Sequence, residues 1–322
     1  MSAAERPRIV VVGAGAIGGW IGAKLALAGQ SVSMLARGET LEALRRDGLR
    51  LTEGAAPRTA EVNASDQPAQ LGPQDLLVIA VKAPALADAA EAARPMIGPD
   101  TMIVPMLNGV PWWFIGEPLA SVDPVGRIAA ALAQRQVIGS VVHAACSRPA
   151  ANQVVVKHAD RLILGEPEGG AGDRIEALAK LFEQAGIAIE RHDDIRRAIW
   201  YKLWGNATIN PLSALTRSTA DRLLADPALR AWMLEAMAEL AAVGAAIGCP
   251  IAESGEDRMA VTGRLGAFKT SMLQDVEAGR PIELEALLGA PREIASSAGV
   301  PTPQLDRLYA LTRLLAENLG LL

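Results

Sequence analysis

The stretch Ile9-Val-Val-Val-Gly13-Ala-Gly15-Ala-Ile-Gly18 decides the fold of this chain. Its four β-branched residues predict a buried strand, and the three glycines follow in the spacing Gly-x-Gly-x-x-Gly. In such a turn the first glycine permits a tight bend and the second lets a pyrophosphate approach the backbone, while the third lets the next helix pack against the strand. The free N–H groups at the start of that helix then face the phosphates. The stretch therefore predicts a dinucleotide-binding turn.

The sequence on either side of the glycines supports this interpretation. We predict a helix over residues 16–28, ended by Gly29, and a second strand over residues 31–36. A strand, a glycine turn, a helix and a second strand form the start of a Rossmann unit. The residues expected to bind the dinucleotide here are Gly13, Gly15, Ala16, Ile17 and Gly18.

The residue after the second strand indicates which dinucleotide binds. A carboxylate at this point holds the ribose 2′-hydroxyl of NAD, but this chain has Arg37 there and no acid until Glu39. A guanidinium suits a 2′-phosphate. The sequence therefore favours NADP(H) as the cofactor. The alternative is that Arg37 is a solvated loop charge and that Glu39 binds the ribose.

Composition and charge exclude several classes of protein. The 31 basic residues are scattered among 36 acidic ones, for a net charge of −5, so no basic stripe is available for a nucleic acid. No apolar run reaches the roughly 18 residues of a membrane span, and glycines interrupt the apolar stretch after Ile9 too often for a secretory signal. The two cysteines form no disulfide framework. We expect a cytoplasmic protein that binds neither nucleic acid nor membrane. The sequence leaves open whether the chain forms a homodimer.

Neither a metal site nor a reactive thiol is predicted. His143, His158 and His192 have no cysteine or carboxylate at the spacing of metal ligands. Cys146 has no helix start or basic cluster near it, apart from Arg148, to activate its thiol.

The order of predicted elements divides the chain into two parts. Up to about residue 190, short β-rich runs alternate with helical ones, which predicts a mostly parallel sheet with helices on both faces. The later strands of this part are expected at residues 76–81, 102–107 and 137–145, in a hairpin of 154–158 with 161–165, and at 187–191; its later helices are expected at 85–93, 126–133 and 173–184.

The remainder of the chain is predicted to be helical. Helices are expected at residues 195–209, 226–247, 256–277, 284–298 and 304–319, with glycine and proline at the joints. The expected fold is therefore α/β: a Rossmann-type, doubly wound N-terminal domain that binds NADP over residues 1–193, and an all-helical C-terminal domain for substrate and catalysis over residues 194–322.

The first helix of the second domain carries a polar stripe. Lys202, Asn206 and Asn210 are spaced by four residues, so they span an arc of about 80° on one helix face. Asparagine is a poor helix former, and an exposed face would more readily carry Glu, Lys or Gln. We interpret the stripe as the lining of a binding site. The spacing leaves equally open that it is solvated and that Asn210 ends the helix before Pro211.

Five elements occur together along the whole chain. They are Gly13-x-Gly-x-x-Gly18, Lys82, Asn108-Gly109, Lys202-Leu-x-x-Asn206-x-x-x-Asn210-Pro-Leu, and Ser271-Met-Leu-Gln-Asp followed by Gly279-Arg-Pro-Ile-Glu283. In this combination and order they resemble the ketopantoate reductase (2-dehydropantoate 2-reductase) family. The resemblance implies a Rossmann domain joined to a helical domain, NADPH as the hydride donor, and reduction of a 2-oxo acid to a 2-hydroxy acid.

The resemblance also implies roles for individual residues. Lys202 would be the general acid that protonates the carbonyl oxygen, and an ammonium in a water-poor site suits the negative charge that develops there. By the same resemblance, Asn206 and Asn210 would bind the substrate through their amides, and Ser271 would bind it through its hydroxyl. Glu283 would position Lys202 or a substrate hydroxyl. Asn108 would link the nicotinamide ribose to the lysine, and Lys82 would contact the cofactor. Without the resemblance, Ser271 is a serine near a helix turn and Glu283 an acid that complements a helix dipole.

The chain departs from the family pattern in the expected substrate shell. Phe268 and Ala220 stand where close members carry asparagine, and Ala-Pro-Ala follows Lys82 without the polar residue often found there. Residues 111–114, Pro-Trp-Trp-Phe, could form a wall of the substrate pocket; equally, the two tryptophans could pack, either beneath it or at a subunit face. Part of the substrate shell is therefore apolar.

The function expected from these observations is NADPH-dependent reduction of a small 2-oxo acid, most specifically of 2-dehydropantoate to pantoate in pantothenate biosynthesis. One alternative is a different branched or aromatic 2-oxo acid. Another is a non-catalytic NADP(H)-binding protein whose helical domain binds a partner. Lys202 favours an enzyme, because a binding module has no need of an ammonium on an asparagine-lined helix.

Overall fold

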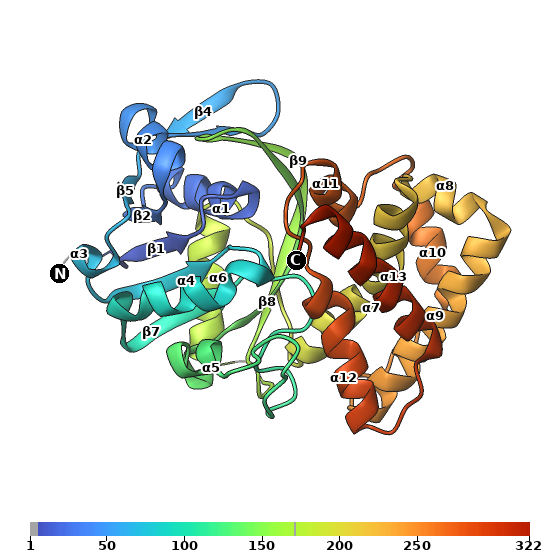
Figure 1. Ribbon diagram of the computed structural model, residues 1–322. Helices are drawn as coiled ribbons and strands as arrows, with labels where there is room; N and C mark the ends of the chain where they lie inside the picture. Colours follow the sequence, from blue (N-terminus) through green and yellow to red (C-terminus); the bar gives the residue numbers. More distant parts are fainter. Residues whose placement is uncertain (1–5, 171) are drawn as a thin grey trace. The chain divides into compact units, whose positions relative to one another are not determined.

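The computed structural model of the chain describes residues 6–170 and 172–322 and divides them into two compact units (Figure 1). The first unit runs up to Leu107 and includes Gly126–Ile195; the second consists of Asn108–Val125 and Arg196–Leu322. The predicted boundary between residues 193 and 194 lies next to Ile195. Residues 108–125, which that boundary leaves in the first domain, are instead part of the second unit.

A parallel sheet forms the centre of the first unit. Its strands are β1 (Ile9–Val12), β2 (Val32–Leu35), β5 (Asn63–Ser65), β6 (Gln74–Ile79) and β7 (Ile97–Pro105), in the order β5-β2-β1-β6-β7. Every neighbouring pair is parallel. The chain order reverses on the two sides of β1, which makes the carboxyl ends of β1 and β6 the topological switch point at which ligands of such sheets bind.

A second, mixed sheet completes the first unit. It contains β3 (Leu49–Thr52), β4 (Pro57–Ala60), β8 (Gly139–Ala150), β9 (Gln153–Gly165) and β10 (Ile189–Arg191). The hairpin predicted within residues 154–165 is wrong, because these residues form the single strand β9, which pairs antiparallel with β8. The pairing passes from Arg161 directly to Ala159, so a register shift of the β-bulge type stands where a turn was expected, and the strand continues through it.

Helices cover both sheets of the first unit. They are α1 (Ala16–Leu27), α2 (Gly38–Asp47), α3 (Pro68–Leu71), α4 (Leu86–Ala93), α5 (Arg127–Ala131) and α6 (Asp173–Gln184), with short 3-10 turns at Ala83–Ala85, Arg94–Met96 and Gln134–Gln136. Helix α1 contacts strands of both sheets, and its residues Trp20, Ile21 and Leu25 are fully buried. A helix that is apolar on all sides suits this position between two layers.

The described residues of the second unit contain helices and no strand. The helices are α7 (Ile195–Thr216), α8 (Ala220–Ala225), α9 (Pro227–Ala246), α10 (Gly255–Gly263), α11 (Ser271–Glu277), a π-helical turn at Glu285–Gly289, α12 (Ala290–Ser297) and α13 (Pro303–Leu319). The predicted fold class, a Rossmann-type sheet domain followed by a helical domain, is therefore confirmed.

Helix α7 continues through Pro211, so the predicted end at residue 209 is wrong. A proline inside a helix removes one backbone hydrogen bond and costs about 3 kcal/mol. Burial of the helix offsets this cost, because Trp200 and Trp204 are 0% and 2% exposed and donate hydrogen bonds to the carbonyls of Leu240 and Met237 on α9, at 3.1 and 2.8 Å. Tertiary packing therefore decides the helix length.

The single helix predicted over residues 256–277 is also wrong. Helix α10 ends at Gly263, Gly266 has a φ of +67°, and the side chain of Thr270 accepts a hydrogen bond from the Leu273 amide at the start of α11. A left-handed glycine and an N-cap threonine are the ordinary signals for such an interruption. Ser271 consequently lies in the first turn of a new helix.

Residues 108–125 belong to the second unit because their aromatic side chains pack there. Trp112, Trp113 and Phe114 are all buried, and the Phe114 ring stacks on Trp200 of α7 with centroids 5.8 Å apart. Of the two interpretations of this segment, packing is the one observed.

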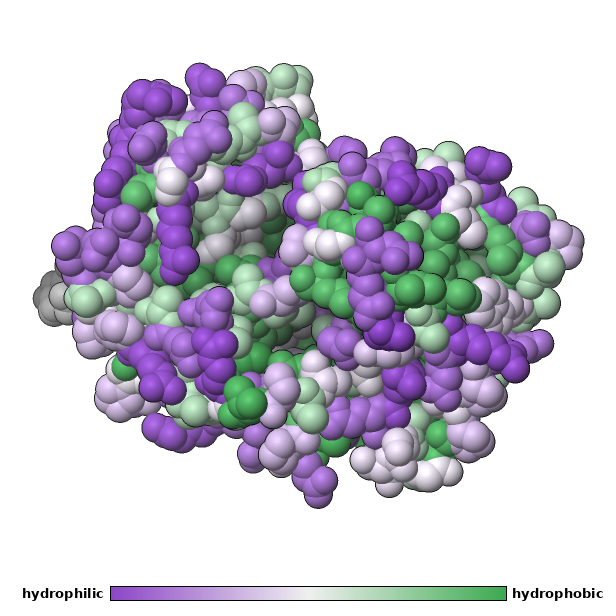
Figure 2. Space-filling view, viewed as in Figure 1, coloured by the Kyte–Doolittle hydropathy of each residue, from purple (hydrophilic) through white to green (hydrophobic). Residues whose placement is uncertain are grey.

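The surface of the second unit carries some apolar side chains. On α13, Leu311, Leu314 and Leu319 are exposed, and Figure 2 has a hydrophobic area where Figure 1 places that helix. Within residues 6–170 and 172–322, no helix has both the length and the apolar character needed to cross a membrane.

Candidate active site

The glycine turn of the first unit has the shape expected of a phosphate cradle. Gly13 has a φ of +101°, and a Cβ on it would lie 2.8 Å from Val81 Cγ1; a Cβ on Gly18 would lie 2.0 Å from the Gly13 oxygen. A Cβ on Gly15 would meet only the Ala80 oxygen, at 4.0 Å. The first and third glycines are thus required by packing, whereas Gly15 keeps an open approach to the backbone. The turn fits a pyrophosphate.

Helix α1 begins directly at this turn. Gly15 is its N-cap and supplies no side-chain hydrogen bond to the first turn, so the N–H groups of that turn stay available to an anion. Ala16 and Ile17 are its first two residues, and Ile17 packs against the core. Their contribution to a ligand would therefore come from the backbone.

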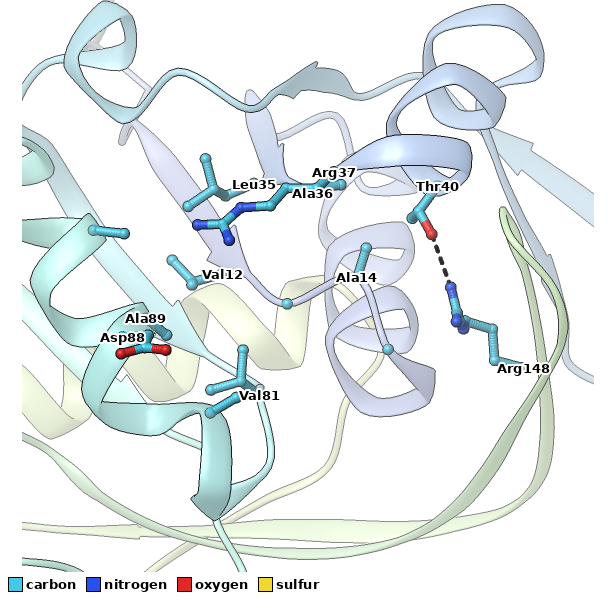
Figure 3. Close-up of a pocket in the computed structure, with 14 residues that line it drawn as sticks. Val12, Ala14, Leu35, Ala36, Arg37, Thr40, Val81, Asp88, Ala89 and Arg148 are labelled. Atoms are coloured by element: carbon cyan, nitrogen blue, oxygen red, sulfur yellow. Dashed lines mark hydrogen bonds between the residues drawn. The ribbon is translucent and has the colours of Figure 1, made fainter. Parts of the chain in front are cut away.

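A pocket of ≈ 410 Å³ opens at the carboxyl ends of β1 and β2 (Figure 3). Small and apolar residues line most of it: Val12, Gly13, Ala14, Gly15, Leu35, Ala36, Val81, Ala85, Ala89 and Ala92. The remaining lining residues are Arg37, Thr40, Asp88 and Arg148. Figure 2 shows the first unit hollowed between the positions of α1 and α4, with pale residues inside and hydrophilic ones at the edge.

The polar residues of this pocket include two that the sequence analysis missed. Arg37 lies in the pocket as predicted, whereas Glu39 is exposed in the first turn of α2 and does not line it. Thr40 of α2 and Arg148 of β8 also line it, and Arg148 Nη1 donates to Thr40 Oγ1 at 3.0 Å. Residues 40 and 148 are far apart in the sequence, so only the fold brings them together.

Lys82 lies outside this pocket. It is exposed and caps the 3-10 turn Ala83–Ala85 that follows β6. The structure places it near the end of a strand, as predicted, but not among the lining residues of the pocket.

In the second unit, three polar side chains form a continuous hydrogen-bonded chain. Lys202 Nζ of α7 donates to Asn108 Oδ1 at 2.9 Å, and Asn108 Nδ2 donates to Glu283 Oε2 at 3.2 Å. The amide of Asn108 thus turns its oxygen toward the ammonium and its NH₂ toward the carboxylate. Glu283 is 8% exposed, so its charge is held inside the protein with this partner. The three residues predicted for lysine-centred chemistry therefore occur together.

Burial changes the acidity of the lysine. It lowers the pKa of the Lys202 ammonium from 10.5 to about 8, and the charge of Glu283 opposes part of this change. A group with such a pKa is still mostly protonated near neutral pH and gives up its proton more readily than an ordinary lysine. The arrangement can therefore protonate an oxygen that gains negative charge.

The predicted amides and hydroxyl lie further along the same helix face. Asn210 is 5% exposed and donates to Ser271 Oγ at 3.4 Å, so it lies inside α7 and does not end that helix. Asn206 and Asn210 both line a pocket of ≈ 170 Å³. Apolar residues form most of its other walls: Ile209, Leu224, Met233, Met237, Met259, Val261, Leu265 and Phe268.

Arg258 of α10 is a further residue of this pocket that the sequence analysis missed. A Cβ on Gly205 would lie 3.0 Å from its Nη2, so the absence of a side chain at Gly205 lets the guanidinium rest on α7. The guanidinium also lies 4.9 Å from the ring centroid of Tyr201, and its Nε is buried without a hydrogen-bond partner. A charged donor thus lies beside the two asparagines.

Other kinds of site are not indicated. No group of three or more potential metal ligands occurs within the described parts of the chain. Burial raises the pKa of the Cys146 thiol to about 12, which keeps it protonated and poorly nucleophilic.

Comparison with protein families assigns both parts of the chain. Residues 9–169 match the family model described as ketopantoate reductase PanE/ApbA, and residues 194–316 match the model of the ketopantoate reductase PanE/ApbA C-terminal part.

Individual relatives match over almost the whole chain. The chain is 42% identical to the 2-dehydropantoate 2-reductase of Mesorhizobium japonicum, with 97% of this chain and 99% of that protein covered. A solved structure from Ralstonia solanacearum MolK2 is 51% identical, with a TM-score of 0.96 and coverage of 99% and 100%. The crystal structure of 2-dehydropantoate 2-reductase from Methylococcus capsulatus is 32% identical, with a TM-score of 0.84 and 97% of each chain covered.

Proposed function

The chain belongs to the ketopantoate reductase family, and on that premise we propose that it reduces 2-dehydropantoate to pantoate with NADPH as hydride donor. Membership makes it an oxidoreductase of the 2-dehydropantoate 2-reductase type, and the family uses a nicotinamide cofactor. The alternative of a non-catalytic binding protein is therefore set aside. The identity of the substrate and the preference for NADP(H) are the parts that we propose.

One observation carries the proposal: the chain of hydrogen bonds from Lys202 through Asn108 to Glu283. When bound, NADPH supplies a hydride to the carbonyl carbon of the 2-oxo acid. Negative charge then develops on the carbonyl oxygen, and Lys202 Nζ both stabilises that charge and donates the proton. Asn108 holds the ammonium in place, and Glu283 keeps the pKa of Lys202 from falling further. Of the two roles that the resemblance implies for Glu283, positioning of Lys202 is therefore the one that we propose.

The preference for NADP(H) rests on the pocket of the first unit. Arg37 lines that pocket and Glu39 does not, which favours a 2′-phosphate over a free ribose hydroxyl. Arg37 is exposed, but its side chain extends over Leu35 and Val12 at the pocket (Figure 3), where it can contact a bound cofactor. We therefore keep NADP(H) as the proposed cofactor.

For the substrate, Asn206, Asn210 and Ser271 are the proposed contacts. Asn210 and Ser271 are within hydrogen-bond distance of each other, so one substrate oxygen can reach both. Amide and hydroxyl groups of this kind suit the carboxylate and hydroxyl oxygens of 2-dehydropantoate.

A second candidate substrate is a 2-oxo acid with a larger apolar side chain. The pocket beside Asn206 and Asn210 favours it, because Met233, Met259 and Phe268 are among its walls. A substrate side chain that lies against these apolar walls gains contacts there without needing a hydroxyl, so this part of the pocket discriminates weakly against a substrate that lacks one.

The experiment is a comparison of 2-oxo acids in an assay of NADPH oxidation, with the product identified by mass spectrometry. We expect 2-dehydropantoate to give the highest kcat/KM and pantoate to accumulate in step with the NADPH consumed. Lys202→Ala should turn over none of these acids at a comparable rate, whereas Lys157→Ala, which changes an exposed lysine of β9, should behave like the wild type. A higher kcat/KM for a bulkier 2-oxo acid would replace the proposed substrate by the second candidate, and no turnover with any 2-oxo acid would refute both.

A further inference from the structure

The cofactor pocket contains a second guanidinium, supplied by the second sheet of the first unit. Arg148 extends from β8 toward α2, where its Nη1 donates to Thr40 Oγ1 at 3.0 Å and to the Ala151 oxygen at 3.4 Å. Figure 3 shows Arg148 and Thr40 on one side of the glycine turn, while Arg37 extends over Leu35 and Val12. The pocket is thus lined by arginines from two different elements.

The charges in this pocket are unbalanced. Within residues 6–170 and 172–322, neither Arg37 nor Arg148 forms an ion pair with a carboxylate. The one acid that lines the pocket, Asp88, is paired with Arg127 at 2.8 Å. Arg127 also pairs with Glu91 at 2.7 Å, so it does not cancel Asp88 alone. The lining has two arginines and one acid, and this positive balance favours an anion as ligand.

The location of these residues identifies the anion. In a Rossmann unit the pyrophosphate lies at the N-terminus of the first helix, and the adenosine ribose lies at the end of the second strand. Strand β2 ends at Leu35, and Thr40 lies in the first turn of the helix that follows Arg37. Arg148 and Thr40 therefore border the ribose position rather than the pyrophosphate position.

We propose that Arg148 and Thr40 form part of the 2′-phosphate site of NADP(H), and that the exposed side chain of Arg37 turns toward them to complete it. The proposal rests on the proposed function, since it deepens the preference for NADP(H). A guanidinium presents several donors in one plane and can keep its bond to Thr40 while another N–H group binds a phosphate oxygen. The Thr40 hydroxyl, which accepts from Arg148, can donate its own proton to the same phosphate.

Tight binding of the phosphate needs both arginines, because each of them is exposed and a single exposed contact is weak. Arg37 and Arg148 both lie at the surface, where water and salt screen a single charge pair. A dianionic phosphate that accepts hydrogen bonds from two guanidinium groups gains more than one exposed contact provides. Arg148 is thus a specificity-determining residue that acts together with Arg37.

The test is equilibrium binding, which needs no turnover. Dissociation constants are measured for NADPH and NADH, and for the fragments 2′,5′-ADP and 5′-AMP, with wild type, Arg148→Ala, Arg148→Lys and Thr40→Val. We expect Arg148→Ala to weaken NADPH and 2′,5′-ADP by about 10- to 100-fold, as for a lost hydrogen bond between charged groups, and NADH and 5′-AMP by less than about 2-fold. Arg148→Lys and Thr40→Val should fall between wild type and Arg148→Ala.

Arg58→Ala is the matched control, because Arg58 is an exposed arginine of β4 that lies outside the pocket. It should leave all four constants within about 2-fold, which excludes a general effect of net charge. An equal loss for NADPH and NADH in Arg148→Ala, or no loss, would overturn the role of Arg148 while leaving the proposed function intact. A wild type that binds both cofactors equally would instead refute the preference for NADP(H) itself, and the present proposal with it.

Discussion

The two candidate sites are built in different ways. The cofactor pocket depends mainly on one short turn, in which Gly13, Gly15 and Gly18 shape the backbone. The lysine site joins side chains from distant parts of the sequence, since Asn108 is 94 residues from Lys202 and 175 from Glu283. The glycine turn that would hold the pyrophosphate therefore resides in local backbone geometry, whereas the lysine site and the contact of Arg148 with Thr40 depend on the tertiary fold.

This difference determines how each site should respond to substitution. Removing a side chain from the lysine site takes away a chemical group but leaves the backbone in place. Adding a side chain to the glycine turn fills space that the cofactor needs. We therefore expect changes in the second unit to act on turnover and changes in the first unit to act on cofactor binding.

The largest effect is expected for Lys202→Ala. Loss of the proton donor should lower kcat by about 10²- to 10⁴-fold, the usual contribution of a positioned general acid. The dissociation constant of NADPH should stay near that of wild type. Steady-state kinetics and a binding titration measure the two quantities separately, and near-normal turnover would show that Lys202 only lines the site.

Gly15→Val tests the glycine turn of the first unit. A Cβ on Gly15 meets nothing closer than the Ala80 oxygen at 4.0 Å, so the variant should fold. Because valine is a poorer N-cap than glycine, its melting temperature should fall by about 2–4 °C. Its side chain would occupy the position of the pyrophosphate, and NADPH affinity should fall by about 100-fold, or about 3 kcal/mol. Thermal melting and a titration check both statements. Unchanged affinity would place the pyrophosphate elsewhere.

Arg37→Ala should have a smaller and more selective effect. Removing one of two guanidinium groups from the 2′-phosphate site should weaken NADPH by about 10-fold and leave NADH nearly unchanged. The difference between the two cofactors should shrink as salt is added, because the contact is exposed. Equal constants for NADPH and NADH in wild type would contradict this expectation.

The sequence predicts the local parts of this molecule well. The strand Ile9–Val12, the glycine turn and the start of α1 follow from neighbouring residues, and so does the location of Arg37 after β2. The polar stripe of α7 was also visible, because Lys202, Asn206 and Asn210 repeat at helical spacing.

The features that could not be predicted from the sequence depend on contacts between residues far apart in the chain. Arg148 meets Thr40 only because β8 lies beside the pocket, and no local pattern marks either residue as a partner of the other. Helix α7 passes Pro211 because its aromatic side chains are buried. The break between α10 and α11 could have been predicted, because Gly266 and Thr270 are residue types that commonly end one helix and begin the next.

The smallest effect is expected for Phe268→Asn, which concerns the substrate and not the chemical step. Phe268 lines the pocket that contains Asn206 and Asn210. An added amide should favour 2-dehydropantoate over its deoxy analogue 3,3-dimethyl-2-oxobutanoate by a further factor of about 5, the value of one neutral hydrogen bond. The ratio of kcat/KM for these two substrates measures this preference. An unchanged ratio would place Phe268 outside the substrate's reach.

The central claim, that Lys202 is the proton donor held by Asn108 and Glu283, is tested most directly by the pH dependence of kcat/KM. Because the protonated lysine is the active form, activity should be constant below its pKa and should fall as the pH rises through about 8. Glu283→Gln removes the carboxylate that raises this pKa, so the decline should begin at a lower pH in that variant. A profile without an alkaline decline in wild type, or a decline that Glu283→Gln leaves in place or moves to higher pH, would contradict the account.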